Sequence, residues 1–167
     1  MDKSVAKIFN LDGSKGTGFF CKIPLSKNKN IPVLISNYHV IKEGTEIEYK
    51  IHKEKKNKKI NLENKFKYAS PLHDIYILEI KEEESNIEYL ELDENVLNAN
   101  NLSYIGNSTF IIHYPNNYDK VAVSYGIIKG RFEDKKYSFR HFSHTEKGSS
   151  GSPILNLSNN KIIGWHS

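Results

Sequence analysis

Short apolar runs separated by turn residues are the feature that most constrains how this chain can fold. The runs are rich in Ile, Val, Tyr and Phe, and Gly, Pro, Asn or Asp bound them, a pattern typical of β-strands. No sustained helical period is present, and one turn around 37–44 is the best helix candidate. The sequence therefore predicts an all-β fold, with strands at 4–10, 17–23, 31–36, 45–51, 74–80, 109–115, 120–128, 136–142, 152–157 and 161–167.

The arrangement of these runs predicts two barrels. In "DIYILEI" (74–80) both faces of the expected strand are apolar, which favours a strand packed on both sides. A polar stretch from 81 to about 101 is interpreted as the connection between two sets of strands. We expect two antiparallel barrels of the six-stranded type with a cleft between them, formed by residues 1–95 and 96–167.

Charge and composition predict few partners. The formal net charge of +4 is too small to indicate nucleic-acid binding by itself. The basic run "KEKKNKK" (53–59) lacks interleaved aromatic residues, and the acidic stretch 81–95 balances it, so both are expected to be solvated loops. No apolar stretch is long enough to span a membrane. We therefore expect neither a nucleic-acid nor a membrane partner.

The single cysteine and the first residues bear on compartment and cofactors. Cys21 has no second cysteine to pair with, and "MDKSVAKIFNLDGSKG" contains no apolar signal core, so a cytoplasmic location is expected. The glycines of "GSKGTG" (13–18) do not match a phosphate-binding loop and are interpreted as a turn before a strand. Cys21, His141 and His144 lack the tight spacing of a metal site, so no metal or cofactor is expected.

Three segments carry residues suited to nucleophilic catalysis. His39 directly follows an apolar run, Asp74 stands at the start of another, and "GSSGSPIL" (148–155) offers three serines. A serine hydroxyl needs a neighbouring base to take its proton, and a histidine titrates near neutrality. Each residue alone also has an ordinary explanation, as a structural histidine, a turn aspartate or a polar loop.

Together these segments resemble the chymotrypsin-like (trypsin-fold) serine peptidases. "SNYHVI" is similar to their histidine motif, "HDIYILEI" to their aspartate motif and "GSSGSPIL" to their Gly-x-Ser-Gly-x-Pro motif, in the order His, Asp, Ser. The resemblance implies a serine endopeptidase that acts on proteins or peptides through an acyl-enzyme. It implies that His39 is the general base, that Asp74 orients His39 and that Ser150 is the nucleophile.

The resemblance also assigns roles to residues around the nucleophile. It implies that the backbone N–H groups of Gly148 and Ser150 form the oxyanion hole, and that Gly148 adopts a positive φ. Gly151 is expected to let the substrate backbone come close, whereas Ser149 and Ser152 are expected to take no part in the chemistry.

Residues near Ser150 resemble a specificity pocket. His144 stands six positions before Ser150, where trypsin-like members carry aspartate, so a preference for Lys or Arg is not expected. Thr145 and His166 are similar in spacing to residues of bacterial glutamyl endopeptidases and viral chymotrypsin-like cysteine proteases. The resemblance implies that His144, Thr145 and His166 bind substrate and that Glu or Gln is preferred before the cut. The alternative is that His166 only packs or faces solvent.

Two departures from the family pattern keep other functions open. In "HYPNNYDKVAVSYGII", His113 stands where glycine is more usual. The sequence stops at Ser167, so the second barrel is expected to be truncated by one strand. The alternatives are an inactive protease-fold binding or scaffolding module, or a fragment of a larger multidomain protein. The oligomeric state is not predicted.

Overall fold

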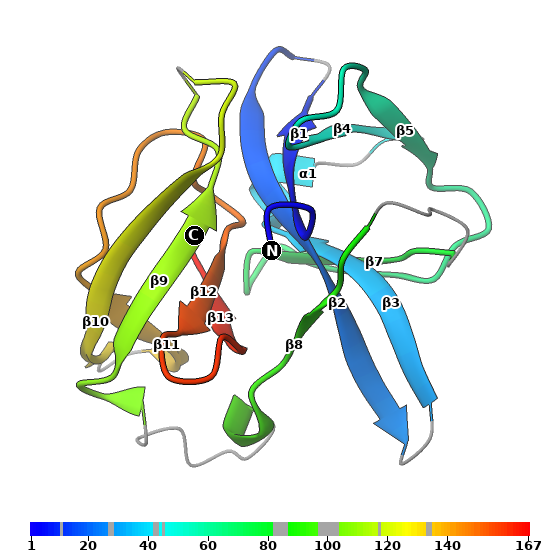
Figure 1. The fold of residues 1–167 in the computed structure, drawn as a ribbon. Helices are drawn as coiled ribbons and strands as arrows, with labels where there is room; N and C mark the ends of the chain where they lie inside the picture. The colour runs from blue at the N-terminus through cyan, green and yellow to red at the C-terminus, as the bar shows by residue number, and fades with distance from the viewer. Residues whose placement is uncertain are drawn as a thin grey trace.

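Two curled antiparallel sheets face each other and form the body of the molecule (Figure 1). The computed structural model describes residues 1–10, 12–26, 29–41, 44, 46–81, 87–96, 104–116, 118–132 and 135–167, without the side chains of 135–137. The architecture confirms the all-β, two-barrel prediction. No helix among the described residues is both long enough and apolar enough to cross a membrane.

The first sheet contains eight strands and the helix that precedes the site. Its order is β5-β4-β1-β2-β3-β7-β6, and β8 pairs with β2 in parallel. Its elements are β1 (Val5–Phe9), β2 (Lys15–Ser26), β3 (Lys29–Ser36), α1 (Tyr38–Ile41), β4 (Glu46–Ile51), β5 (Lys58–Asn61), β6 (Lys67–Ser70), β7 (Ile75–Glu79) and β8 (Leu90–Glu91).

The second sheet is formed by strands from the last third of the chain, after the short 3-10 helix η1 (Glu94–Val96). Its order in the described residues is β11-β10-β9-β12-β13. The elements are β9 (Ser108–His113), β10 (Ala122–Phe132), β11 (Lys135–His141), β12 (Pro153–Asn156) and β13 (Ile162–Trp165). The expected domain boundary at 95/96 falls between the two sheets and remains a prediction.

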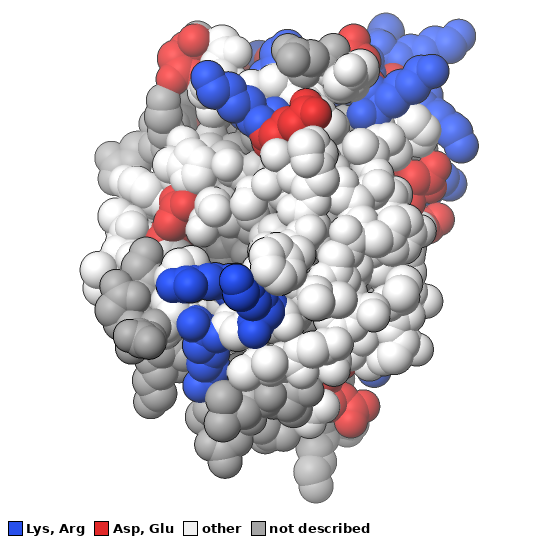
Figure 2. Space-filling model, turned by 90° about the vertical axis from the view of Figure 1, so that its left-hand side faces the viewer, with Lys and Arg blue, Asp and Glu red and all other residues white. Residues whose placement is uncertain are grey.

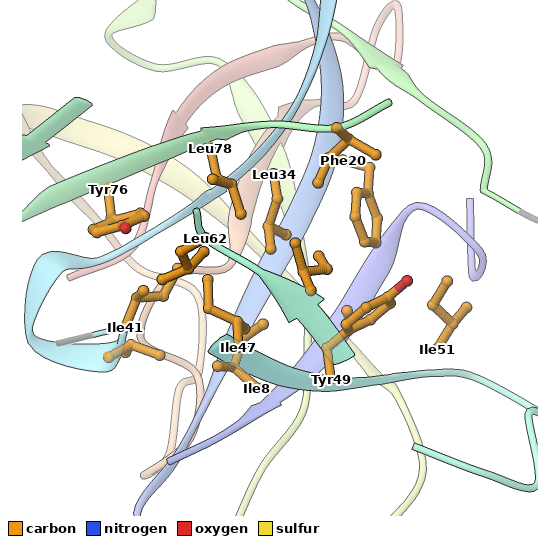
Figure 3. Close-up of a cluster of buried hydrophobic side chains, with 14 residues drawn as sticks. Ile8, Phe20, Leu34, Ile41, Ile47, Tyr49, Ile51, Leu62, Tyr76 and Leu78 are labelled. Atoms are coloured by element: carbon orange, nitrogen blue, oxygen red, sulfur yellow. The ribbon is translucent and has the colours of Figure 1, made fainter. Parts of the chain in front are cut away.

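Apolar side chains fill the first sheet and the space between the two sheets. Figure 3 shows Phe20, Leu34 and Leu78 gathered with side chains of β4 inside the first sheet. Strand β7 serves two clusters, because Tyr76 and Leu78 pack there whereas Ile75 and Ile77 face the cluster between the sheets. This confirms that the strand is packed on both sides. The cluster between the sheets takes residues from both, including Phe19, Cys21, Val33, Phe110, Ile112, Leu155 and Ile162.

The prediction that the charged runs are loops is partly wrong. The basic run leads into β5, where Ile60 is buried while Lys59 stays exposed and its Nζ lies 2.6 Å from Glu46 Oε1. The acidic stretch contains β8, in which Leu90 is buried against β2. A buried apolar residue stabilises each of these short strands, and the cross-strand Lys59–Glu46 pair adds to this in β5. Residues 82–86 and 97–103 lie outside the described part of the chain.

The side of the molecule where β10 lies has a broad uncharged area next to a group of basic side chains (Figure 2). Figure 2 looks at the side of the molecule where β10 lies and shows a wide uncharged area, with Lys and Arg side chains gathered at its lower left. Three alternate residues of β10 are exposed, namely Val123, Tyr125 and Ile127. The predicted catalytic residues lie elsewhere, where the two sheets meet.

Candidate active site

His39 and Asp74 are held together by two hydrogen bonds. His39 lies in α1, which follows β3, and Asp74 immediately precedes β7, the neighbour of β3 in the sheet. Asp74 Oδ1 accepts the backbone N–H of His39 at 3.0 Å, and Asp74 Oδ2 lies 2.7 Å from His39 Nδ1. Because a carboxylate only accepts, Nδ1 carries the hydrogen, and in the neutral ring Nε2 is left as an acceptor. This is the tautomer that a general base requires.

The backbone at Asp74 is unusual and is supported locally. Asp74 has a φ of +48°, in the left-handed region that aspartate tolerates better than most residues. The side-chain amide of Asn37 donates to the Asp74 carbonyl oxygen at 2.8 Å. The side chains of His39 and Asp74 remain 53% and 32% exposed, so the pair is open to a ligand.

The helix that carries His39 packs on the first residues of β2. A Cβ at Gly16 would lie 2.5 Å from Val40 Cγ1, so only glycine lets α1 approach β2 this closely. The next residue, Thr17, donates its backbone N–H to the carbonyl oxygen of Ser150 at 2.8 Å. Consecutive residues of β2 therefore contact the helix of His39 and the predicted nucleophile.

The Ser150 hydroxyl makes no hydrogen bond with His39, or with any other residue, within the described part of the chain. Ser150 is half-buried in the turn between β11 and β12. Hydrogen bonds between nucleophile and base are often long without substrate and tighten when substrate binds. The structure therefore joins two of the three predicted catalytic side chains directly, and the place of Ser150 in the triad remains a prediction.

Glycines at 148 and 151 shape the nucleophile turn. Gly148 has a φ of +94°, as expected, and Gly151 has a φ of +87°. A Cβ on Gly151 would overlap the Thr17 carbonyl oxygen and the Ser36 hydroxyl. The expectation that Gly151 makes room for substrate stays a prediction, and the packing gives a further reason for glycine here. Glycine is needed there because the turn packs directly on the first sheet.

The two predicted oxyanion donors are both available. Among the described residues, neither the Gly148 N–H nor the Ser150 N–H donates to a protein acceptor. Each donor shares a peptide plane with the carbonyl group of the preceding residue, and both carbonyl groups are hydrogen-bonded. Lys147 O, in the plane of the Gly148 N–H, accepts from the Asn116 N–H at 2.7 Å. Ser149 O, in the plane of the Ser150 N–H, accepts from the Ser152 N–H at 3.1 Å. Since the C=O and N–H of a trans peptide point in opposite directions, these bonds also fix the direction of both donors.

Thr17 is a site residue that the sequence interpretation missed. Its hydroxyl accepts the backbone N–H of Tyr114 at 3.0 Å and donates to the carbonyl oxygen of Gly148 at 2.7 Å, and the residue is fully buried. It is the first residue of the strand predicted at 17–23, and the observed β2 begins two residues earlier, at Lys15. The sequence signal was a polar residue between two glycines, but its partners are about a hundred or more residues away.

Among the predicted specificity residues, His166 has the most defined surroundings. Its backbone N–H donates to Ser152 O at 2.9 Å, and its carbonyl oxygen accepts from the Gly151 N–H at 2.8 Å, so it lies beside the nucleophile turn. Its Nδ1 lies 3.2 Å from His141 Nε2. Burial, followed by the nearby imidazoles of His141 and His113, lowers the pKa of His166 to about 4.

These contacts define the tautomer of His166. His141 Nδ1 accepts the Ser143 N–H at 3.3 Å, so the hydrogen of the neutral His141 ring lies on Nε2 and points to His166 Nδ1. The hydrogen of the His166 ring is then on Nε2, as a neutral donor.

The other two predicted pocket residues do not join His166. His144 is 79% exposed, with its Nε2 3.4 Å from Glu146 Oε1. Thr145 is half-buried, and neither residue hydrogen-bonds His166 in the described chain. Their role in substrate binding remains a prediction. No group of three or more His, Cys, Asp or Glu among the described residues is arranged to hold a metal ion.

Comparisons with known proteins identify a matching family model and solved structures with a similar fold. A family model described as "Trypsin-like peptidase domain" matches residues 16–164. No curated protein matches the sequence. Similar solved structures include a serine endoprotease from Yersinia pestis, at 18% identity and a TM-score of 0.70. That match covers 98% of this chain and 53% of the other, so this chain spans about half its length.

Two further structures share the fold at similar distance. A human pathogenic astrovirus serine protease has 17% identity and a TM-score of 0.68, with 100% of this chain and 83% of the other covered. Deg5 has 20% identity and a TM-score of 0.68, with 99% and 79% covered. At these identities the similarity shows a shared fold and nothing beyond it.

Proposed function

Because the chain belongs to the family of trypsin-like peptidase domains, we propose that it is a serine endopeptidase with His39, Asp74 and Ser150 as its catalytic triad. The observation that carries the proposal is the His39–Asp74 pair, whose hydrogen bonds leave His39 Nε2 as an acceptor. The turn that carries Ser150 adds two backbone donors without a protein acceptor among the described residues. These contacts support the proposal of a base with its orienting carboxylate and of a nucleophile turn with anion donors.

The reaction follows from these groups. His39 Nε2 takes the Ser150 proton while Ser150 Oγ attacks the carbonyl carbon of the scissile peptide bond. The negative charge on the carbonyl oxygen is met by the N–H groups of Gly148 and Ser150. Protonated His39 then gives its proton to the leaving amine, which leaves an acyl-enzyme on Ser150. Water, deprotonated by His39, releases the acid and restores the serine.

The proposal extends to the residue before the cut. A neutral His166 that donates from Nε2 suits a side chain with an accepting oxygen, as in Gln or Glu. The low pKa of His166 means that it offers a hydrogen bond without a positive charge, so burying a carboxylate there costs more than burying an amide. We therefore expect Gln to be preferred to Glu near neutral pH, and both to be preferred to Leu and Lys.

Covalent labelling with a fluorophosphonate tests the proposed chemistry. Intact-mass analysis should show one adduct on the wild type and none on Ser150→Ala. Ser167→Ala is a matched control, because it removes an exposed serine from the chain end beside His166 and should label like the wild type. A folded wild-type chain that takes no label would contradict the proposal and favour a protease-fold binding module.

A peptide panel with Gln, Glu, Leu or Lys before the cut tests the specificity. The wild type should show its highest kcat/KM for Gln, and His166→Leu should lower the Gln-to-Leu ratio about tenfold, as expected for the loss of one hydrogen bond. If the wild-type protein cleaved the four peptides equally well, His166 would not determine specificity, and the proposal of the triad would be unaffected.

A further inference from the structure

His113 lies buried behind the nucleophile turn, at the last residue of β9. It is 2% exposed, and both of its ring nitrogens contact hydroxyl groups. Nδ1 lies 2.7 Å from Ser149 Oγ, and Nε2 lies 3.0 Å from Ser124 Oγ on β10. A histidine at this position was noted in the sequence only as a departure from the more usual glycine. The structure gives it two specific partners.

The hydrogen atoms in this cluster can be assigned by counting donors and acceptors. Ser149 Oγ accepts the backbone N–H of Glu146 at 3.1 Å, and among the described residues His113 Nδ1 is the only acceptor for the Ser149 hydroxyl hydrogen. Ser149 therefore donates to Nδ1, and the ring hydrogen lies on Nε2 and points to Ser124. In the opposite tautomer, the buried hydroxyl hydrogen of Ser149 would have no acceptor, which is costly.

The surroundings keep this imidazole neutral. Burial has the largest effect and lowers the pKa of His113, and the facing His144 acts in the same direction. Glu146 acts in the opposite direction, and His113 in turn lowers the pKa of His166, which directly follows β13. Protonation would add a hydrogen to Nδ1 and remove the acceptor on which Ser149 depends.

Ser149 links this histidine to the proposed chemistry, because it lies between the two oxyanion donors. Ser149 is fully buried, and its backbone N–H donates to Glu146 O at 3.0 Å while its hydroxyl oxygen accepts the Glu146 N–H. Both the main chain and the side chain of Ser149 therefore hold the turn that begins at Glu146. Rotation about the backbone bonds of Ser149 would turn the peptide plane between residues 149 and 150, which carries the Ser150 N–H, and would shift the neighbouring Gly148.

We propose that His113 is a positioning residue that fixes the oxyanion hole by accepting the Ser149 hydroxyl hydrogen on Nδ1. The inference rests on the proposed function, since an oxyanion hole matters only if Ser150 forms an acyl-enzyme. Oxyanion donors act mainly in the transition state. Loss of the His113–Ser149 bond should therefore lower kcat and leave KM nearly unchanged.

Two substitutions at His113 separate its two hydrogen bonds. In His113→Asn the side-chain carbonyl oxygen can replace Nδ1 as the acceptor for Ser149. In His113→Gln the amide reaches toward Ser124 instead and leaves Ser149 without a partner. Ser149→Ala removes the same bond from the other side, and Ser124→Ala is the matched control that removes the bond on the far side of the ring.

The readouts are hydrolysis of p-nitrophenyl acetate, corrected for the Ser150→Ala rate, and the rate of fluorophosphonate labelling. We expect His113→Gln and Ser149→Ala to lose about 10- to 100-fold in kcat, less than the roughly 100- to 1,000-fold cost of deleting one oxyanion donor. The double variant should be no worse than Ser149→Ala alone, since that substitution already removes the His113–Ser149 bond together with the bond from the Glu146 N–H. His113→Asn and Ser124→Ala should retain most of the activity.

The imidazole ¹⁵N shifts of wild-type His113 give a second test that does not depend on activity or on variants folding. They should report hydrogen on Nε2 and none on Nδ1. Hydrogen on Nδ1, or wild-type kcat in both His113→Gln and Ser149→Ala, would overturn the inference while the peptidase proposal stands. A wild type that neither labels nor hydrolyses the ester would overturn the peptidase proposal, and the positioning role would fall with it.

Discussion

The backbone N–H of Thr17 donates a 2.8 Å hydrogen bond to the carbonyl oxygen of Ser150. The bond crosses between the two sheets, because Thr17 belongs to β2 and Ser150 precedes β12. The Thr17 side chain makes a second crossing bond to the Gly148 carbonyl oxygen. The proposed nucleophile and oxyanion hole are thus held by the first sheet, although their residues belong to the second half of the chain.

Thr17→Val should weaken both folding and activity. Valine keeps the shape of threonine but leaves the Tyr114 N–H and the Gly148 carbonyl oxygen buried without partners, at roughly 1–3 kcal/mol for each group. Urea unfolding should show the loss, and fluorophosphonate labelling should slow. Thr17→Ser keeps the hydroxyl and should stay close to the wild type in both measurements. Equal stability of the valine and serine variants would show that these bonds contribute little.

Gly151→Ala should disrupt the site far more than Gly13→Ala. Both glycines have a positive φ, of +87° and +79°, so both alanine variants carry a similar backbone strain of about 1–2 kcal/mol. Only the new Cβ at 151 would overlap Thr17 and Ser36, since Gly13 has no atom within 4 Å of the corresponding position. The difference between the unfolding free energies of the two variants therefore measures the cost of the steric overlap at 151 apart from the cost of backbone strain. Equal losses would mean that the turn can move away from the first sheet without cost.

Local patterns explain why most strands could be predicted from the sequence. The alternation in "DIYILEI" and the turn residues around each run act within a few neighbours, and β7 is packed on both faces as expected. The lysine-rich β5 was missed because it is stabilised by pairing with β4, including the ion pair between Lys59 and Glu46. A local pattern of apolar residues does not reveal such a pairing between two strands. The motifs around His39, Asp74 and Ser150 were likewise visible because each is a short stretch.

The supporting contacts of the site could not be predicted in the same way. Thr17 meets Tyr114 and Gly148, and His113 meets Ser149, only after the two sheets and the nucleophile turn have packed. No periodicity or spacing marks such pairs in a single sequence, because each depends on tertiary packing. These contacts were found only from the folded structure.

Asp74→Asn should remove activity with little loss of stability. Asparagine tolerates the left-handed φ of +48°, so the backbone should remain in place. Its amide group would donate to His39 Nδ1, which would move the ring hydrogen to Nε2 and prevent it from taking the Ser150 proton. From the triad template, kcat should fall by about 10⁴-fold. Wild-type kcat in this variant would exclude Asp74 from the triad, whereas a large loss of unfolding free energy would indicate a structural role instead.

Acidification should destabilise the protein through His166. Its pKa is lowered to about 4 in the folded chain, whereas an exposed histidine titrates near 6.5. Between these values the unfolded chain binds more protons than the folded chain, so the free energy of unfolding falls as pH falls from about 6.5 to about 4. Buried His113 and His141 act in the same direction.

His166→Asn isolates the contribution of this residue, because its side-chain oxygen can still accept from His141 but does not titrate. Urea midpoints measured at about pH 7.5 and pH 5 should fall for both proteins, and the fall should be smaller for the variant. Asp93 does not obscure the comparison at pH 5, because burial raises its pKa but the hydrogen bonds from Asn159, Tyr104 and Asn95 outweigh burial and lower it below the ordinary value. Equal falls in the two proteins would mean that the folded chain does not hold His166 neutral, and would remove the basis for preferring Gln to Glu before the cut.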